Sequence, residues 1–393
     1  MRALACLLAL ATVAHASEPN IVGMGVRSPG MAGTGVADTT GYEAAYTNPA
    51  GLAGASQRQI NVGYIVGRYH LDLDDKPRSV DGTEGLLLGA NVPLPFGGFL
   101  KDKLGVGLGF YLPGTLITRA RAPFPDETRL ALLETQTQTV SITVALGAQL
   151  HRRLQVGIGV LALAALAGQI TIRSDAGGRI TTLSEQQLVT GFAPTAGVRV
   201  LLRPWVTVGA SLVGESKATY DIRVSTQLSG QLPIDLPPLR FLGVAQYDPL
   251  RLSMEGSFVP RDWVRINAGF TFKNWARYQR PIENATPGAP ELPEPGFKDT
   301  VVPRIAVELT ARSKYLRFDG RLGYFFEWSP APSGPGRVLL DADRHALTFG
   351  VGLQLLRWVG LRVDAYGQFH QLAGSPRAGG QFGFFGCAMG LDL

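Results

Sequence analysis

The sequence predicts an all-β protein, a transmembrane antiparallel β-barrel of about 14 strands with an N-terminal segment that plugs its lumen. Three observations predict this fold. They are an export signal at the N-terminus, apolar residues that alternate along much of the chain, and connections that are alternately short and long. Glycine is abundant, with 49 of 393 residues, and only 17% of residues are charged. This composition fits a barrel in the outer membrane of a Gram-negative bacterium better than a soluble domain.

Residues 1–16 have the pattern of a secretory signal peptide. Arg2 supplies the positive charge, an apolar run follows, and Ala14-His15-Ala16 provides the small residues of a cleavage site. A short buried helix is the alternative interpretation of the same run. Cleavage after Ala16 would leave Cys387 as the single cysteine, so we expect no internal disulfide in the exported chain.

Residues 17–58 are too rich in glycine and too irregular to be strands. A barrel of this width would have an open lumen, so we expect the segment to fill it as a plug, with the barrel formed by residues 59–393. A disordered periplasmic tail is the alternative. Asn48-Pro49-Ala50 comes just before the first predicted strand. Asn favours the start of a turn and Pro fixes φ, so we expect a turn that joins plug and barrel.

The strands are recognised by alternation with a period of two. In residues 264–273, for example, Ile266 and Phe270 share one face, while Arg265, Asn267 and Lys273 share the other. In the second half of the barrel the polar face carries charge, and we expect it to point into the lumen. The residues predicted to do so are Arg265, Lys273, Glu308, Arg317, Asp319, Arg321, Glu327, Arg362 and Asp364.

The connections between strands fall into two classes. Short turns are expected near residues 95–103, 151–153, 203–204, 260–262, 312–314 and 357, and long loops at 72–82, 113–135, 173–187, 215–238, 279–299, 329–341 and 373–378. Several short turns combine a basic residue with an aromatic one, a pairing that a membrane interface favours. The turns are therefore assigned to the periplasm and the loops to the outside.

The lumen is expected to be apolar in one place. Residues 156–168 are apolar or glycine on both faces, so Leu161 and Leu163 would point inward without a polar lining. An apolar wall with a few cations suits a ligand with an apolar body and an anionic head. Packing of these side chains against the plug is the alternative. By inward position and charge, Arg265, Lys273 and Arg321 are the candidates for holding a carboxylate.

No pattern predicts catalysis, a metal or a cofactor. The histidines lie far apart, and there is no nucleophile elbow. The basic pI of 9.4 is not interpreted as nucleic-acid binding, because Lys and Arg are dispersed and the signal directs export. A basic rim facing anionic lipid is the simpler explanation. The expected partners are a hydrophobic small molecule and outer-membrane lipid, including lipopolysaccharide, and the expected state is a monomer.

A family resemblance adds to this interpretation. Residues 23–54 resemble the N-terminal hatch of FadL-type outer-membrane transporters for long-chain fatty acids and aromatic hydrocarbons. The shared features are a Gly/Ala-rich segment, the step Ala37-Asp38, and Asn48-Pro49-Ala50 before the first strand. Residues 321–332 and 341–352 are similar to the family's Ser-Pro-x-Pro loop and the following Asp-x-Asp-Arg strand, and residues 191–200 are a weaker match.

The resemblance implies a fourteen-stranded barrel closed by the hatch, with ligand taken from outside and released sideways through a kink in the third strand. That strand would be residues 103–114, and the candidates for the opening are Gly105, Gly107, Gly109, Pro113 and Gly114. Glycine and proline can leave ladder hydrogen bonds unmade. A side exit would also keep a fatty chain of roughly 16 methylenes out of water, which costs about 0.8 kcal/mol per methylene.

The function expected from the residues and the resemblance is passive, hatch-gated diffusion of a hydrophobic or amphipathic molecule, without catalysis. Two alternatives remain open at this point. A barrel of the same kind could scaffold or anchor surface proteins without transporting anything. A polar-solute porin is the other alternative, and ion conductance in planar bilayers would identify it.

Overall fold

The computed structural model describes residues 21–53, 57–98, 101–114, 128–133, 140–174, 180–228, 239–279, 282–284, 294–334, 336–356 and 360–393. The expected signal peptide, residues 1–16, lies outside these ranges. None of the helices in the described ranges is long and apolar enough to cross a membrane.

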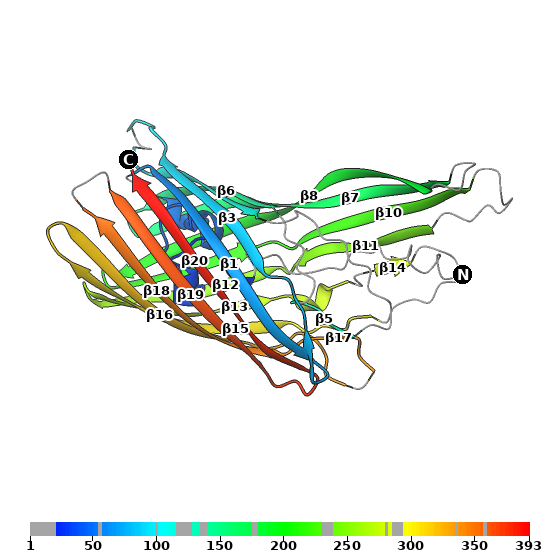
Figure 1. Cartoon of the computed structure of the whole chain (residues 1–393). Helices are drawn as coiled ribbons and strands as arrows, with labels where there is room; N and C mark the ends of the chain where they lie inside the picture. Colours follow the sequence, from blue (N-terminus) through cyan, green and yellow to red (C-terminus); the bar gives the residue numbers. More distant parts are fainter. Residues whose placement is uncertain are drawn as a thin grey trace.

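The predicted fold class is confirmed, because the sheet closes into an antiparallel barrel of 14 strands (Figure 1). Closure occurs where β1 and β20 pair from Gln59–Asp392 to Leu73–Ala378. In order around the barrel the strands are β1 (Gln59–Leu73), β3 (Thr83–Pro93), β4 (Leu104–Pro113), β6 (Val140–His151), β7 (Leu154–Ser174), β8 (Ile180–Arg203), β9 (Val206–Val213), β12 (Arg251–Arg261), β13 (Val264–Lys273), β15 (Thr300–Arg312), β16 (Leu316–Glu327), β18 (Asp343–Leu355), β19 (Leu361–Ala373) and β20 (Ala378–Asp392).

Alternation sets the two faces of the wall. Apolar side chains such as Leu322, Phe349 and Met389 are more than half exposed on the outside, where lipid would cover them. The charged side chains that the sequence predicts to face inward are buried or half-buried in the lumen. Cys387 is free and exposed on the outer face of β20, opposite Tyr64 of β1.

Two predicted loops, residues 173–187 and 215–238, are instead partly strand. β7 and β8 form one long hairpin, while β9 continues into β10 (Ser216–Leu228), and β11 (Leu239–Asp248) leads into β12. β10 also pairs in parallel with the end of β7. These strands extend beyond the barrel, away from the C-terminus (Figure 1). A strand that leaves the bilayer needs no apolar lipid face, so the alternation used to predict strands is lost there.

Short elements shape the loops at the same end. β2 (Lys76–Arg78) folds back on β1, and the 3₁₀ turn η4 (Trp275–Arg277) follows β13. β14 (Ile282–Asn284) pairs with β11. β5 (Arg129–Leu130) pairs in parallel with β17 (Leu339–Leu340), which joins the loop after β4 to the loop after β16.

Residues 21–53, here called the hatch, lie inside the barrel (dark blue in Figure 1). They contain only short helical turns, which are η1 (Pro29–Met31), α2 (Ala44–Thr47) and η2 (Pro49–Leu52). Nearly all of these residues are buried, and none of them pairs with a strand of the wall. The hatch is therefore held by side chains and by close packing.

A row of glycines provides the close packing. Gly105, Gly147, Gly157 and Gly197 lie directly opposite one another on β4, β6, β7 and β8. The turn η2 packs on this row. A Cβ atom on Gly147 would lie 2.6 Å from the backbone nitrogen of Ala53, closer than real Cβ contacts. Only glycine therefore lets the main chain of the hatch lie this close to the wall.

Replacing Gly147 with Val is expected to push the hatch off the wall, because the added atoms would meet main chain that cannot rotate away. Overpacking of a core costs about 1–3 kcal/mol, and we expect the upper end of that range here. The thermal unfolding midpoint in detergent and the protease sensitivity of the hatch would measure it. Gly256→Val is the matched control, since nothing lies within 4 Å of its added Cβ. Equal behaviour of the two variants would contradict the packing role.

Candidate functional site

The joint between hatch and wall centres on Asn48, which is 1% exposed. Its side-chain amide donates to the carbonyl of Val36 in the hatch at 2.6 Å and to the carbonyl of Val198 on β8 at 3.1 Å. Its side-chain oxygen accepts from the backbone N–H of Ala50 at 3.1 Å, which caps η2 directly before Pro49. One side chain thus binds the turn, the rest of the hatch and the wall.

The third strand of the barrel is β4, and its ladder is continuous. β4 pairs with β3 from Gly105 to Pro113, and with β6 from Leu104 to Tyr111. The expected interruption of the ladder is therefore absent along this stretch. Just beyond it, the backbone N–H of Gly114 still donates to the carbonyl of Glu84 at 2.8 Å.

Two glycines of β4 lie against the hatch. A Cβ atom on Gly107 would lie 2.6 Å from Cδ2 of Leu52, and one on Gly109 would lie 2.6 Å from the sulfur of Met24. Both partners belong to the hatch. The glycines thus create room for hatch side chains, and these side chains cover the inner face of the strand here.

Two strands farther around the barrel from β8, the hatch is held by a carboxylate. The carboxylate of Glu255 on β12 accepts hydrogen bonds from the backbone N–H groups of Gly35 at 2.8 Å, Val36 at 3.3 Å and Ala37 at 3.2 Å. Consecutive backbone N–H groups form an anion-binding nest. A buried wall carboxylate therefore anchors the hatch main chain.

Asp38 of the hatch forms a second ionic anchor. It accepts hydrogen bonds from Arg27 at 2.7 Å, from Asn267 at 2.8 Å and from Arg265. Arg27 also binds Glu308 of the wall at 2.8 Å. Burial opposes ionisation of Asp38, but the two guanidinium groups prevail and lower its pKa to about 2. We call these contacts, with those of Glu255, the ionic latch.

Below the latch, toward the C-terminal end of the barrel, lie cavities of about 290 and 500 Å³ with charged walls. Arg265 lines both. Arg321 lies beside them, fully buried, and binds Glu308 and Asp364 at 2.8 Å each. These two carboxylate-binding candidates are thus already paired with carboxylates of the protein. Neither Arg265 nor Arg321 therefore offers an unpaired charge to a ligand's head group.

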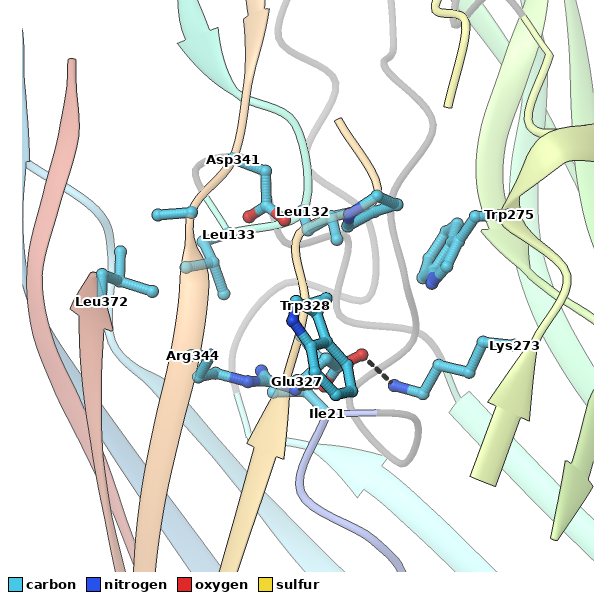
Figure 2. A pocket seen from close by; sticks show the side chains of 12 residues that line it. Ile21, Leu132, Leu133, Lys273, Trp275, Glu327, Trp328, Asp341, Arg344 and Leu372 are labelled. Carbon is cyan, nitrogen blue, oxygen red and sulfur yellow. Dashed lines mark hydrogen bonds and ion pairs between the residues drawn. The ribbon is translucent and has the colours of Figure 1, made fainter. Parts of the chain in front are cut away.

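Lys273 lies above the hatch, in a different compartment. It donates to Glu327 at 2.5 Å, and Arg344 binds the same carboxylate (Figure 2). The cavity around them measures about 30 Å³ and lies between Ile21 of the hatch and the loops. Its lining, here called the upper site, consists of Ile21, Leu132, Leu133, Lys273, Trp275, Glu327, Trp328, Pro330, Asp341, Ala342, Arg344 and Leu372.

Two further groups make the upper site amphipathic. Trp275 is 1% exposed, and its indole nitrogen has no hydrogen-bond partner among the described atoms. Burial raises the pKa of Asp341 to about 7, although hydrogen bonding and Arg344 oppose the shift. Near neutral pH this carboxyl is therefore only partly ionised, and the two cations beside it outweigh the carboxylates.

A larger and more polar cavity, of about 70 Å³, adjoins the upper site through Ile21 and Lys273. Arg251 donates to the hydroxyl of Tyr46 at 2.8 Å, and Arg304 donates to the carbonyl of Ala32 at 2.6 Å. Both arginines keep buried guanidinium nitrogens without a partner in the described part of the chain. The space above the hatch is therefore electropositive.

The apolar candidates Leu161 and Leu163 point inward, and each is 1% exposed. They belong to the same buried cluster as Val22 and Met24 of the hatch. Their surface is already covered, which favours packing against the plug over contact with a ligand.

Sequence reasoning missed Glu255, Trp275, Asp341 and the arginines above the hatch. Glu255 and Arg304 had a usable signal. Glu255 is the only carboxylate in a strand of alternating serines and apolar residues, and Arg304 shares a face of β15 with Glu308, which the sequence predicts to point inward. The others lie at strand ends or in loops, where alternation stops. Within the described ranges, no group of three or more His, Cys, Asp or Glu is placed to hold a metal ion.

Proteins of known structure share this architecture. No family model matches the chain, and no curated protein matches its sequence. Solved structures do match over nearly the whole length. A Pseudomonas aeruginosa FadL homologue aligns with a TM-score of 0.64 at 12% identity, covering 94% of this chain and 98% of its own. The fold is that of the FadL-type barrels.

Two other FadL-type barrels agree with this assignment. The Ralstonia pickettii toluene transporter TbuX aligns with a TM-score of 0.62 at 15% identity, and covers 95% of this chain and 99% of its own. The P. putida toluene transporter TodX aligns with a TM-score of 0.57 at 16% identity over the same shares. At these identities the likeness shows the fold, and the ligand must be argued from this chain's own residues.

Replacing Asp38 with Asn should weaken the latch in a pH-dependent way. A pKa lowered from 3.8 to about 2 stabilises the folded state above the unfolded pKa, and this stability is lost as the pH falls through 2. We expect the variant to be about 2 kcal/mol less stable at neutral pH, with the gap shrinking between about pH 4 and pH 2. Thermal unfolding in detergent across this range would measure it.

The exposed turn residue Asp102 provides the control, because Asp102→Asn should change stability by less than about 0.5 kcal/mol. A gap between wild type and Asp38→Asn that stays constant down to pH 2 would show that the ionised carboxylate does not hold the hatch.

Proposed function

We propose that this FadL-type barrel is an outer-membrane transporter that takes up hydrophobic or amphipathic small molecules by passive diffusion. The observation that carries the proposal is the upper site, where apolar side chains and an excess of cations meet between the loops and the hatch. A pocket of this composition suits an apolar body with an anionic head. The description of TbuX and TodX as toluene transporters supports an apolar cargo.

The hatch would act as the gate. Its second half, around η2, packs main chain against the glycine row, while its first half is held by the ionic latch. Ionic contacts between side chains can exchange partners without disturbing a β-ladder. We therefore propose that the segment from Arg27 to Asp38 moves and that η2 stays in place or follows later.

Opening of the side exit would depend on movement of the hatch. The hatch side chains Met24 and Leu52 fill the space beside Gly109 and Gly107 of β4. A gap in this strand can only reach the lumen after those side chains withdraw. Lateral release at residues 105–114 would thus require prior movement of the hatch, which keeps the wall closed when no ligand is present.

The head group would be held at Lys273. Arg265 and Arg321 lie below the hatch, so of the three candidates Lys273 alone lines the upper site. Lys273 is also paired with a carboxylate, Glu327, but Arg344 shares that carboxylate with it. Arg251 and Arg304 extend the cationic surface below it. No catalytic step is proposed for these residues.

A second function, scaffolding of surface proteins, is favoured by one observation. The hairpins β7–β8 and β10–β11 form a sheet that extends beyond the barrel (Figure 1). Deleting this sheet would separate the two functions. Transport predicts that ligand binding in the upper site survives the deletion, and scaffolding predicts loss of a bound surface protein.

Replacing Lys273 with Met should weaken binding of dodecanoate more than binding of dodecanol, because only the former carries a charge for the ammonium group to hold. A charge-assisted hydrogen bond contributes about 1.5–3 kcal/mol, which corresponds to roughly ten- to hundredfold in affinity. Titration calorimetry of the purified protein in a non-ionic detergent would compare the two ligands. Lys298→Met, at an exposed loop position, is the control. Equal losses for both ligands would contradict the head-group role.

The pKa of Asp341 predicts a pH dependence for the same site. Its carboxyl is neutral below about pH 7 and charged above it, and a charged carboxylate repels an anionic ligand. Binding of decanesulfonate, which stays ionised, should weaken as the pH rises from about 6 to about 8. Asp341→Asn should flatten this profile. An unchanged profile in the variant would show that another group titrates.

A further inference from the structure

The turns at the C-terminal end of the barrel carry an excess of exposed positive charge. Among the described residues, eight basic side chains are exposed there and two acidic ones, Asp102 and Asp262. We call the eight the basic rim: Arg58, Lys101, Arg152, Arg153, Arg203, Arg261, Arg312 and Lys314. The opposite end differs, because its exposed charges are mixed: Asp72, Asp74, Asp75, Asp81, Glu294 and Asp299 against Arg68, Lys76, Lys217, Arg277 and Lys298.

The protein does not neutralise the rim. None of the eight side chains forms an ion pair with another described residue. Deeper in the lumen the pattern is the reverse, since Arg27, Arg265, Arg317, Arg321 and Arg362 each bind one or more carboxylates. The rim charges are therefore available to a partner outside the chain.

Aromatic residues place the rim at the height of lipid head groups. Trp205, Trp263 and Tyr315 are each about half exposed, at 50%, 58% and 51%, and each directly follows a turn of the rim. The ammonium group of Lys314 lies 5.7 Å from the centre of the Tyr315 ring. Tryptophan and tyrosine on a barrel surface lie at the membrane interface, so the neighbouring cations reach the phosphates of that leaflet.

We propose that the basic rim binds anionic phospholipid, such as phosphatidylglycerol, in the leaflet at the C-terminal end of the barrel. Six of the eight cations are arginines, whose forked guanidinium groups bind phosphate oxygens in pairs. The eight cations are distributed over five successive turns and Arg58, which pairs with the last residue of the chain. This spacing suits many separate lipids rather than one compact ligand. The rim thereby fixes the depth of the barrel in the membrane, independently of what passes through the lumen.

The test uses the full-length protein, stripped of lipid in detergent and titrated with phosphatidylglycerol or zwitterionic phosphatidylethanolamine, with bound lipids counted by native mass spectrometry. Each surface cation contributes about 1 kcal/mol to binding of anionic lipid, or roughly fivefold in affinity. Arg152→Gln with Arg153→Gln should therefore weaken phosphatidylglycerol binding roughly ten- to thirtyfold. Phosphatidylethanolamine binding should not change.

Lys76→Gln with Lys298→Gln is the matched control, because it removes two exposed charges from the opposite end. The heat-modified mobility of each barrel on gels would show that every variant is folded. The proposal is overturned if both lipids bind equally, or if the rim and control pairs lose affinity alike. It is also overturned if the rim retains an acidic periplasmic protein whose binding does not depend on lipid charge.

Discussion

The main chain of the hatch packs directly on glycines of the wall, and the rest of the lumen depends on this contact. Gly147, Gly157 and Gly197 bring β6, β7 and β8 close enough for Asn48 to bond a wall carbonyl. The same closeness lets hatch side chains occupy the inner face of β4, whose ladder to both neighbours is continuous. The hatch therefore separates two compartments of the lumen, and the side chains that line them differ.

The two compartments differ in how charge is balanced. Below the hatch, Asp38, Glu308 and Asp364 are each paired with arginine, so the space is polar but nearly neutral. Above it, Lys273 and Arg344 share one carboxylate, and aromatic and aliphatic side chains complete the wall. An amphipathic anion would be attracted to the upper space and find no equivalent attraction below, so it would collect above the hatch, while its concentration gradient would still set the direction of net diffusion.

The sequence predicted the membrane strands well, because each must present an apolar side chain to lipid at every second position. It failed for β10 and for the outer ends of β7 and β8, which carry no such requirement outside the bilayer. Selection by inward position named Lys273 and Arg265 together, because both lie on the same face of β13. What distinguishes them is the height of the hatch, which depends on tertiary packing that no local pattern of residues encodes.

The position of the free thiol has a practical consequence. Cys387 projects from the outer face of β20 toward Tyr64, at the seam where the first and last strands meet. Cys6 would be absent from an exported chain cleaved after Ala16, so a maleimide dye or spin label would react at one place without engineering. A quencher placed in the acyl chains would report separation of β1 from β20 in native membranes. It would distinguish a barrel whose first and last strands separate from one that opens elsewhere.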